Sequence, residues 1–182
     1  MNVENSEALL LIPNGFPVWI DVAQASIGGA GTAMRFVLPL HAHNLPLMHR
    51  QQTKLVVALK GVLDIRAGRK RIALLQEGEA IKLDPGIAHR IHQYGTVAST
   101  VGAVLWPGAV EQAFRELAVA ALQKAYQRSD MIEILARYDV VWTTQSHEHE
   151  HDPESITIRP FRDWLSDLPE ALARLLALRW GG

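Results

Sequence analysis

The first 107 residues alternate short β-rich runs with turn signals and contain no helical pattern. Glycine and proline lie between the runs, as in Glu77-Gly78 and Pro85-Gly86, where they favour reversals of the chain. Many short strands at this spacing are typical of an antiparallel sandwich or closed barrel. The predicted strands span residues 16–22, 32–38, 54–60, 62–67, 71–76, 80–84, 88–94 and 96–106.

Pro107-Gly108 ends this region, and the hydrophobic period then changes to that of a helix. Apolar residues recur at helical spacing in 109–128 and again in 130–138. The sequence Asp-Leu-Pro-Glu at 167–170 resembles a helix start and predicts a last helix that ends near residue 180. The expected domains are a β-barrel, residues 1–107, and a helical extension packed on the barrel, residues 108–182.

The composition limits the classes of function that the chain can have. Its net charge of −1 at pH 7 gives no general attraction to nucleic acid or to an anionic membrane surface. The chain has no cysteine, which excludes disulfides and thiolate metal sites and favours an intracellular location. The apolar run at residues 8–12 is too short for a signal peptide or a membrane span. We therefore expect a cytoplasmic protein that has neither nucleic-acid nor membrane partners.

Two spaced motifs in the β region carry the residues with chemical potential. The motifs are His49-x4-Lys54-x6-Gly61 and Gly78-x5-Asp84-Pro85-Gly86-x2-His89-x3-Gln93. Because side chains alternate along a strand, Lys54 shares a face with Val56, and His89 shares a face with Gln93. If these faces look into a barrel, His49, Lys54, His89 and Gln93 converge near one end. Such a concave pocket with few polar groups is the usual form of a ligand site.

The two motifs resemble those of the cupin superfamily, and the resemblance covers roughly residues 30–107. It implies an RmlC-like, all-β fold: an antiparallel double-stranded β-helix, or jelly roll, with a C-terminal helical extension here. In metal-bearing cupins, two histidines and a glutamate of the first motif bind one divalent ion together with a histidine of the second. His49 and His89 match two of these ligands, whereas Leu47 and Lys54 replace the other two.

Lys54 decides between a site for a cation and a site for an anion. An ammonium beside two imidazoles repels a metal ion, and two histidines retain little of a four-ligand site. The leading hypothesis is therefore a small-molecule pocket for an anionic or polar metabolite, with no tightly bound cofactor. Lys54 would hold the anion and Gln93 would orient it. His49 or His89 would be the acid or base of an isomerase, epimerase or cyclase, unless the pocket only binds or senses its ligand.

Two alternatives concern the same pocket and the other histidines. His41 and His43 form a His-x-His pair six residues before the family's position, and a shifted strand would bring one of them to His49 and His89. Such a set would hold nickel, zinc or iron and make the chain a dioxygenase-like enzyme. The histidines of 147–151 alternate with glutamates and could bind zinc or nickel weakly, although a solvated loop is the simpler interpretation. The second alternative is an inert barrel from which Lys54 extends to solvent.

The strand predicted at 54–60 is apolar on both faces, because Leu55, Val57 and Leu59 alternate with other apolar residues. Such a strand must be covered on its outer face as well. The extension or a second subunit can cover it, and the resemblance implies a homodimer. A further hypothesis is a non-catalytic interaction protein in which residues 109–182 form the binding surface.

Overall fold

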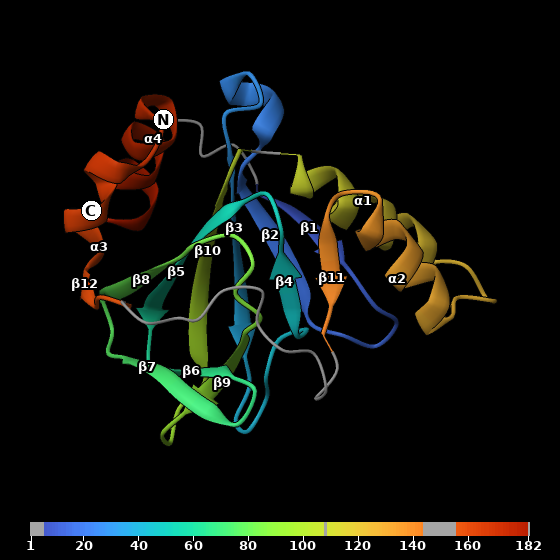
Figure 1. Ribbon diagram of the computed structural model, residues 1–182, viewed down its shortest axis with the longest axis horizontal. Helices are drawn as coiled ribbons and strands as arrows, with labels where there is room; N and C mark the ends of the chain where they lie inside the picture. Colours follow the sequence, from blue (N-terminus) through green and yellow to red (C-terminus); the bar gives the residue numbers. More distant parts are fainter. Residues whose placement is uncertain (1–5, 108, 144–155, 182) are drawn as a thin grey trace.

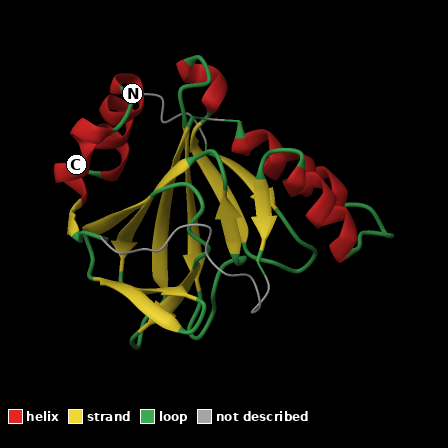
Figure 2. Cartoon of the chain, viewed as in Figure 1, coloured by secondary structure: helices red, strands yellow, loops and turns green. Residues whose placement is uncertain are grey.

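The residues that the computed structural model describes, 6–107, 109–143 and 156–181, form three antiparallel sheets flanked by helices (Figures 1 and 2). The strands are β1 (Glu7–Leu10), β2 (Pro17–Val22), β3 (Thr32–Leu38), β4 (Leu47–His49), β5 (Thr53–Lys60), β6 (Val62–Ala67), β7 (Lys70–Leu75), β8 (Glu79–Leu83), β9 (Arg90–Tyr94), β10 (Ser99–Trp106), β11 (Val140–Trp142) and β12 (Arg159–Pro160). The largest sheet has the order β1-β2-β3-β10-β5-β8-β12, another has the order β7-β6-β9, and β11 pairs with β4. In the largest sheet β10 lies between β3 and β5, so strands far apart in the sequence are neighbours.

The helices after β10 lie on one side of the strands and those near the C-terminus lie on the opposite side, with a short helical segment from the N-terminal part of the chain between them (Figure 2). The helical segments are η1 (Gln24–Ile27), α1 (Val110–Ala121), α2 (Arg128–Ala136), α3 (Phe161–Trp164), η2 (Leu165–Asp167) and α4 (Glu170–Trp180). None of the helices in the described ranges is long and apolar enough to cross a membrane.

The predicted fold class, an antiparallel β-barrel with a C-terminal helical part, is confirmed. The observed β3 and β6 coincide with the runs predicted at 32–38 and 62–67, and the other predicted strands differ by a few residues at their ends. The extension is not purely helical, because β11 pairs with β4 and β12 pairs with β8. The sequence had not predicted β1, β4 or β11, which are only three or four residues long.

Strand β5 is buried on both faces. Val56 and Ala58 point into the core inside the barrel. Leu55 and Val57 point outward into a second apolar cluster, which α3 and α4 supply. The helical side chains of that cluster are Phe161, Trp164, Leu172 and Leu176. The C-terminal helices therefore cover the outer face of the sheet whose inner face carries Lys54.

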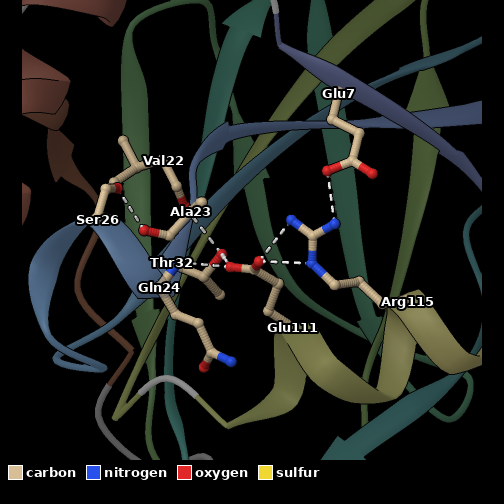
Figure 3. A network of polar contacts seen from close by, with 8 residues as sticks. All are labelled: Glu7, Val22, Ala23, Gln24, Ser26, Thr32, Glu111 and Arg115. Atoms are coloured by element: carbon tan, nitrogen blue, oxygen red, sulfur yellow. Dashed lines mark hydrogen bonds and ion pairs between the residues drawn. The ribbon is translucent and has the colours of Figure 1, made fainter.

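A buried carboxylate fixes α1 to the barrel (Figure 3). Glu111, which is 2% exposed, accepts hydrogen bonds from the Thr32 hydroxyl at 2.8 Å and from the Gln24 backbone N–H at 2.6 Å. Arg115, one turn further along α1, pairs with Glu111 at 2.8 Å and with Glu7 of β1. Buried charges are stable only when they are paired and hydrogen-bonded, and the Glu111–Arg115 pair joins α1 to β1, β3 and η1.

Removal of this carboxylate should destabilise the fold. We expect Glu111→Ala to lower the free energy of unfolding by roughly 2–3 kcal/mol, because several hydrogen bonds to a buried charge are lost together. Urea unfolding followed by circular dichroism measures the change. Glu133→Ala, at an exposed position of α2, is the control and should change the value by less than about 0.5 kcal/mol. Equal stability of the two variants would show that the network is not a structural anchor.

Candidate functional site

Three titratable side chains meet inside the barrel. Their exposed fractions are 4% for His49 on β4, 5% for Lys54 on β5 and 3% for His89 just before β9. Lys54 lies on the inner face of β5, as strand alternation predicts. The structure thus brings together three of the four pocket residues that the sequence analysis selected.

Backbone pairing explains how residues far apart in the sequence converge. The Gly86 N–H donates to the His49 carbonyl at 2.8 Å, and the His89 N–H donates to the Leu47 carbonyl at 3.3 Å. These bonds hold β4 against the segment that leads to β9. Lys54 is placed by its two neighbouring strands, where it lies opposite residues of β8 and β10.

Lys54 and His89 are in direct contact. The two atoms, Nζ of Lys54 and Nε2 of His89, are 2.9 Å apart. The other ring nitrogen of His89, Nδ1, lies 3.0 Å from the Ile87 carbonyl, which can only accept, so Nδ1 carries a proton. When the imidazole is neutral, the Lys54 amine donates to the lone pair on Nε2, so a proton can lie on either partner of this contact.

Burial disfavours the charged forms of Lys54 and His49. It lowers the pKa of Lys54 to about 7. Burial also lowers the pKa of His49 well below its usual value, and the nearby Lys54 and His89 add to this decrease. Neither ring nitrogen of His49 has a hydrogen-bond partner among the described residues. Its ring centroid is 6.2 Å from that of His89. His49 thus keeps a donor and an acceptor for a molecule that enters the site.

A cavity of about 590 Å³ leads to these residues, with Lys54 and His49 in its wall. This volume falls in the range of sites that take small organic molecules. Most of the wall is apolar. The apolar wall includes Leu11, Ile12, Phe16, Val18, Met34, Phe36, Leu45, Leu47, Ala103, Leu105, Phe114 and Trp142.

The C-terminal extension supplies part of this wall. Phe114 of α1, Arg128 of α2 and Trp142 of β11 line the cavity, together with Thr143. The Arg128 guanidinium lies 5.0 Å from the centre of the Trp142 ring, a cation–π contact. The sequence analysis had missed these residues. The apolar run Val140–Trp142 was the available signal, since β-branched and aromatic residues favour a strand.

The ionisable side chains in the described part of the cavity wall are all basic. His43, Arg90 and Arg128 join Lys54 and His49 in the wall, and none of the described lining residues is aspartate or glutamate. This lining disfavours a cationic ligand and favours a neutral or anionic group.

The other predicted site residues have different surroundings. The Gln93 amide is buried but occupied: it accepts from the His41 N–H and donates to the carbonyls of Gly95 and Val97. His41 is exposed, and the ring centroids of His43 and His92 are 5.3 Å apart. Gln93 thus braces loops and is absent from the cavity wall. The histidines of 147–151 lie outside the described residues.

The donor set does not fit the four-ligand metal site that the resemblance to cupins implies. Nδ1 of His89 bonds the Ile87 carbonyl and Nε2 faces the Lys54 amine, so neither nitrogen offers a lone pair to a metal ion. Within the described ranges, no three His, Cys, Asp or Glu side chains are grouped so that they could hold one. His41 and His43 do not complete such a group.

No protein-family model matches the chain, and no curated protein matches it. Solved structures similar to it include KdgF from Halomonas, with 14% identity over 62% of this chain and 94% of that chain and a TM-score of 0.49. An RmlC-like cupin from Shewanella frigidimarina has 12% identity, with 60% and 90% of the two chains covered and a TM-score of 0.46. The polyketide cyclase RemF from Streptomyces resistomycificus has 14% identity, with 59% and 78% covered and a TM-score of 0.48.

The described residues form antiparallel sheets with a C-terminal helical part, and the solved structures similar to the chain include a protein described as an RmlC-like cupin. The likeness to solved structures concerns the fold alone. Enzymes of several kinds share this fold, so the chemistry of this chain has to be argued from its own cavity.

The buried amine should make stability depend on pH. The unfolded chain keeps the Lys54 proton up to its ordinary pKa of 10.5, whereas the folded chain releases it near pH 7. Between these values the unfolded state binds more protons, so the free energy of unfolding rises with pH, by about 1.4 kcal/mol per unit. We expect this slope between pH 7.5 and 9.5 in denaturant unfolding of the natural chain, and its loss in Lys54→Met.

Lys82→Met is the matched control for that experiment. Lys82 lies on the neighbouring strand β8 but points to the outer side, 6.0 Å from the centre of the Trp164 ring. This variant should keep the slope of the natural chain. If Lys54→Met keeps the same slope, the amine is not buried as described.

A carboxylate in place of the amine should create a metal site. Lys54→Glu removes the donor that occupies Nε2 of His89 and adds an oxygen ligand beside His49 and His89. We expect the affinity for nickel or zinc to rise at least about tenfold over the natural chain, as three protein ligands become available. Isothermal titration measures it, with Lys82→Glu as the control for a carboxylate at the surface. Equal affinities in both variants would contradict the proximity of these side chains.

Proposed function

We propose that the chain is a metal-independent small-molecule cupin whose ligand has an apolar body and one anionic or polar group. The observation that carries this proposal is the buried His49 beside Lys54, since neither of its ring nitrogens has a hydrogen-bond partner in the described part of the chain. A buried polar group without a partner is costly, so a ligand that satisfies it gains affinity. The apolar wall would bury the rest of the ligand.

The sequence analysis expected an anionic or polar metabolite, and the cavity narrows that description. A strongly hydrated ligand such as a sugar would leave its hydroxyls unsatisfied against Phe36, Met34 and Leu105. A carboxylate or enolate on an aromatic or aliphatic body would suit both the wall and Lys54. Arg90 and Arg128 in the same wall add positive charge.

The same three side chains can move a proton. Lys54 and His89 share one across a 2.9 Å contact, and His49 offers a second imidazole to a bound molecule. Proton transfer without a metal is the chemistry of isomerases, epimerases and cyclases. We therefore favour this class of reaction over the dioxygenase alternative, for which the ligand set does not fit.

Binding of carboxylates tests the proposal. We expect 3-phenylpropionate or decanoate to bind, and 3-phenylpropanol to bind more weakly, because only the carboxylates pair with the Lys54 ammonium. Lys54→Met should weaken carboxylate binding by roughly 10- to 100-fold, the value of a charge-assisted contact. In the natural chain, affinity should fall as pH rises above 7, because the amine loses its proton.

Isothermal titration gives the affinities, and native mass spectrometry of freshly purified protein reports any co-purified ligand together with the number of subunits, which tests the proposed homodimer. Lys82→Met is again the control and should bind like the natural chain. Equal binding of the carboxylates and the alcohol, independent of Lys54, would contradict an anion site. Absence of binding by every probe and of any co-purified molecule would overturn the proposed function.

A further inference from the structure

Among the described residues, Lys54 has no carboxylate partner of the kind that usually holds a buried lysine in its charged form. In the described part of the chain the ion pairs join arginines to carboxylates, and Lys54 takes part in none of them. Its hydrogen bond is made to a neutral imidazole. A carboxylate would stabilise the ammonium, whereas a neutral imidazole can also receive its proton.

The surroundings of the amine favour its neutral, nucleophilic form. The side chain is 5% exposed and ends at an apolar cavity. Desolvation of this kind activates lysine toward carbonyl carbon. A dry wall also disfavours the return of water, which would hydrolyse an imine.

We propose that Lys54 forms a reversible imine with an aldehyde or ketone whose apolar body occupies the cavity. This inference rests on the proposed function, since it places the ligand in the same cavity, and it names a carbonyl compound as its class. In this inference His89 has a role of its own, because it moves protons to and from the Lys54 nitrogen.

The side chains present can balance each step. The Lys54 nitrogen attacks the carbonyl carbon, and the C=O π electrons move to oxygen. The nitrogen passes a proton to Nε2 of His89, which passes it on to the oxygen and so gives a neutral carbinolamine. Nε2 of His89 then accepts the remaining N–H proton and delivers it to the hydroxyl, which leaves as water while the C=N bond forms. The product is a neutral imine, His89 is unchanged, and one water is released for each carbonyl bound.

Reductive trapping tests this proposal with the full chain. The protein is incubated at pH 7.5 with a low concentration of 3-phenylpropanal and sodium cyanoborohydride, and its intact mass and peptides are followed over time. We expect one adduct whose mass is that of the aldehyde less one oxygen, on Lys54, forming at least tenfold faster than on Lys82 or Lys60. The natural chain alone decides the site, so the result does not depend on a variant that folds.

Two further samples separate this inference from the proposed function. Lys54→Met should lose the fast adduct and keep the slow surface labelling, and Lys82→Met should keep the fast adduct. Modification spread evenly over the surface lysines, with Lys54 unmodified, would overturn the imine. If 3-phenylpropionate still binds in that case, the pocket proposal stands and only the covalent step is wrong. If neither compound occupies the cavity, both proposals are wrong.

Discussion

The burial of β5 on both faces is the constraint on which the rest of the structure depends. One face of the strand carries Val56 and Ala58 into the barrel, and the other carries Leu55 and Val57 into the cluster formed with α3 and α4. From Lys54 to Ala58 the strand is covered on both sides and its side chains are buried. Lys54 is on that inner face, so the same packing that stabilises the sheet places an amine in an apolar interior.

The amine in turn determines what the neighbouring histidines can do. His89 uses one nitrogen on the Ile87 carbonyl and the other on Lys54, so it is a proton acceptor rather than a metal ligand. Among the described residues His49 has no hydrogen-bond partner for either ring nitrogen, and it lies in the cavity wall. A single side chain, Lys54, therefore occupies the nitrogen of His89 that a metal ion would need and places an amine beside two imidazoles.

The sequence predicted the parts of this arrangement that local periodicity controls. Alternation placed Lys54 inside the barrel, and motif spacing placed it near His49 and His89. Strand alternation also predicted that Gln93 is buried. It could not predict that the Gln93 amide forms its hydrogen bonds with the backbone of His41, Gly95 and Val97. A buried amide has to satisfy all its hydrogen bonds, and which partners do so depends on loop geometry rather than on period.

The cavity could not be predicted from the sequence, because segments far apart in the chain form its wall. Trp142 reaches it through the pairing of β11 with β4, and Phe114 reaches it because Glu111, one turn earlier on α1, is anchored to the barrel (Figure 3). The barrel thus provides the polar end of the cavity and most of its apolar wall, and the extension completes the wall with Phe114 and Trp142. In the proposed function, differences in the extension would change which molecule fits while leaving Lys54, His49 and His89 in place.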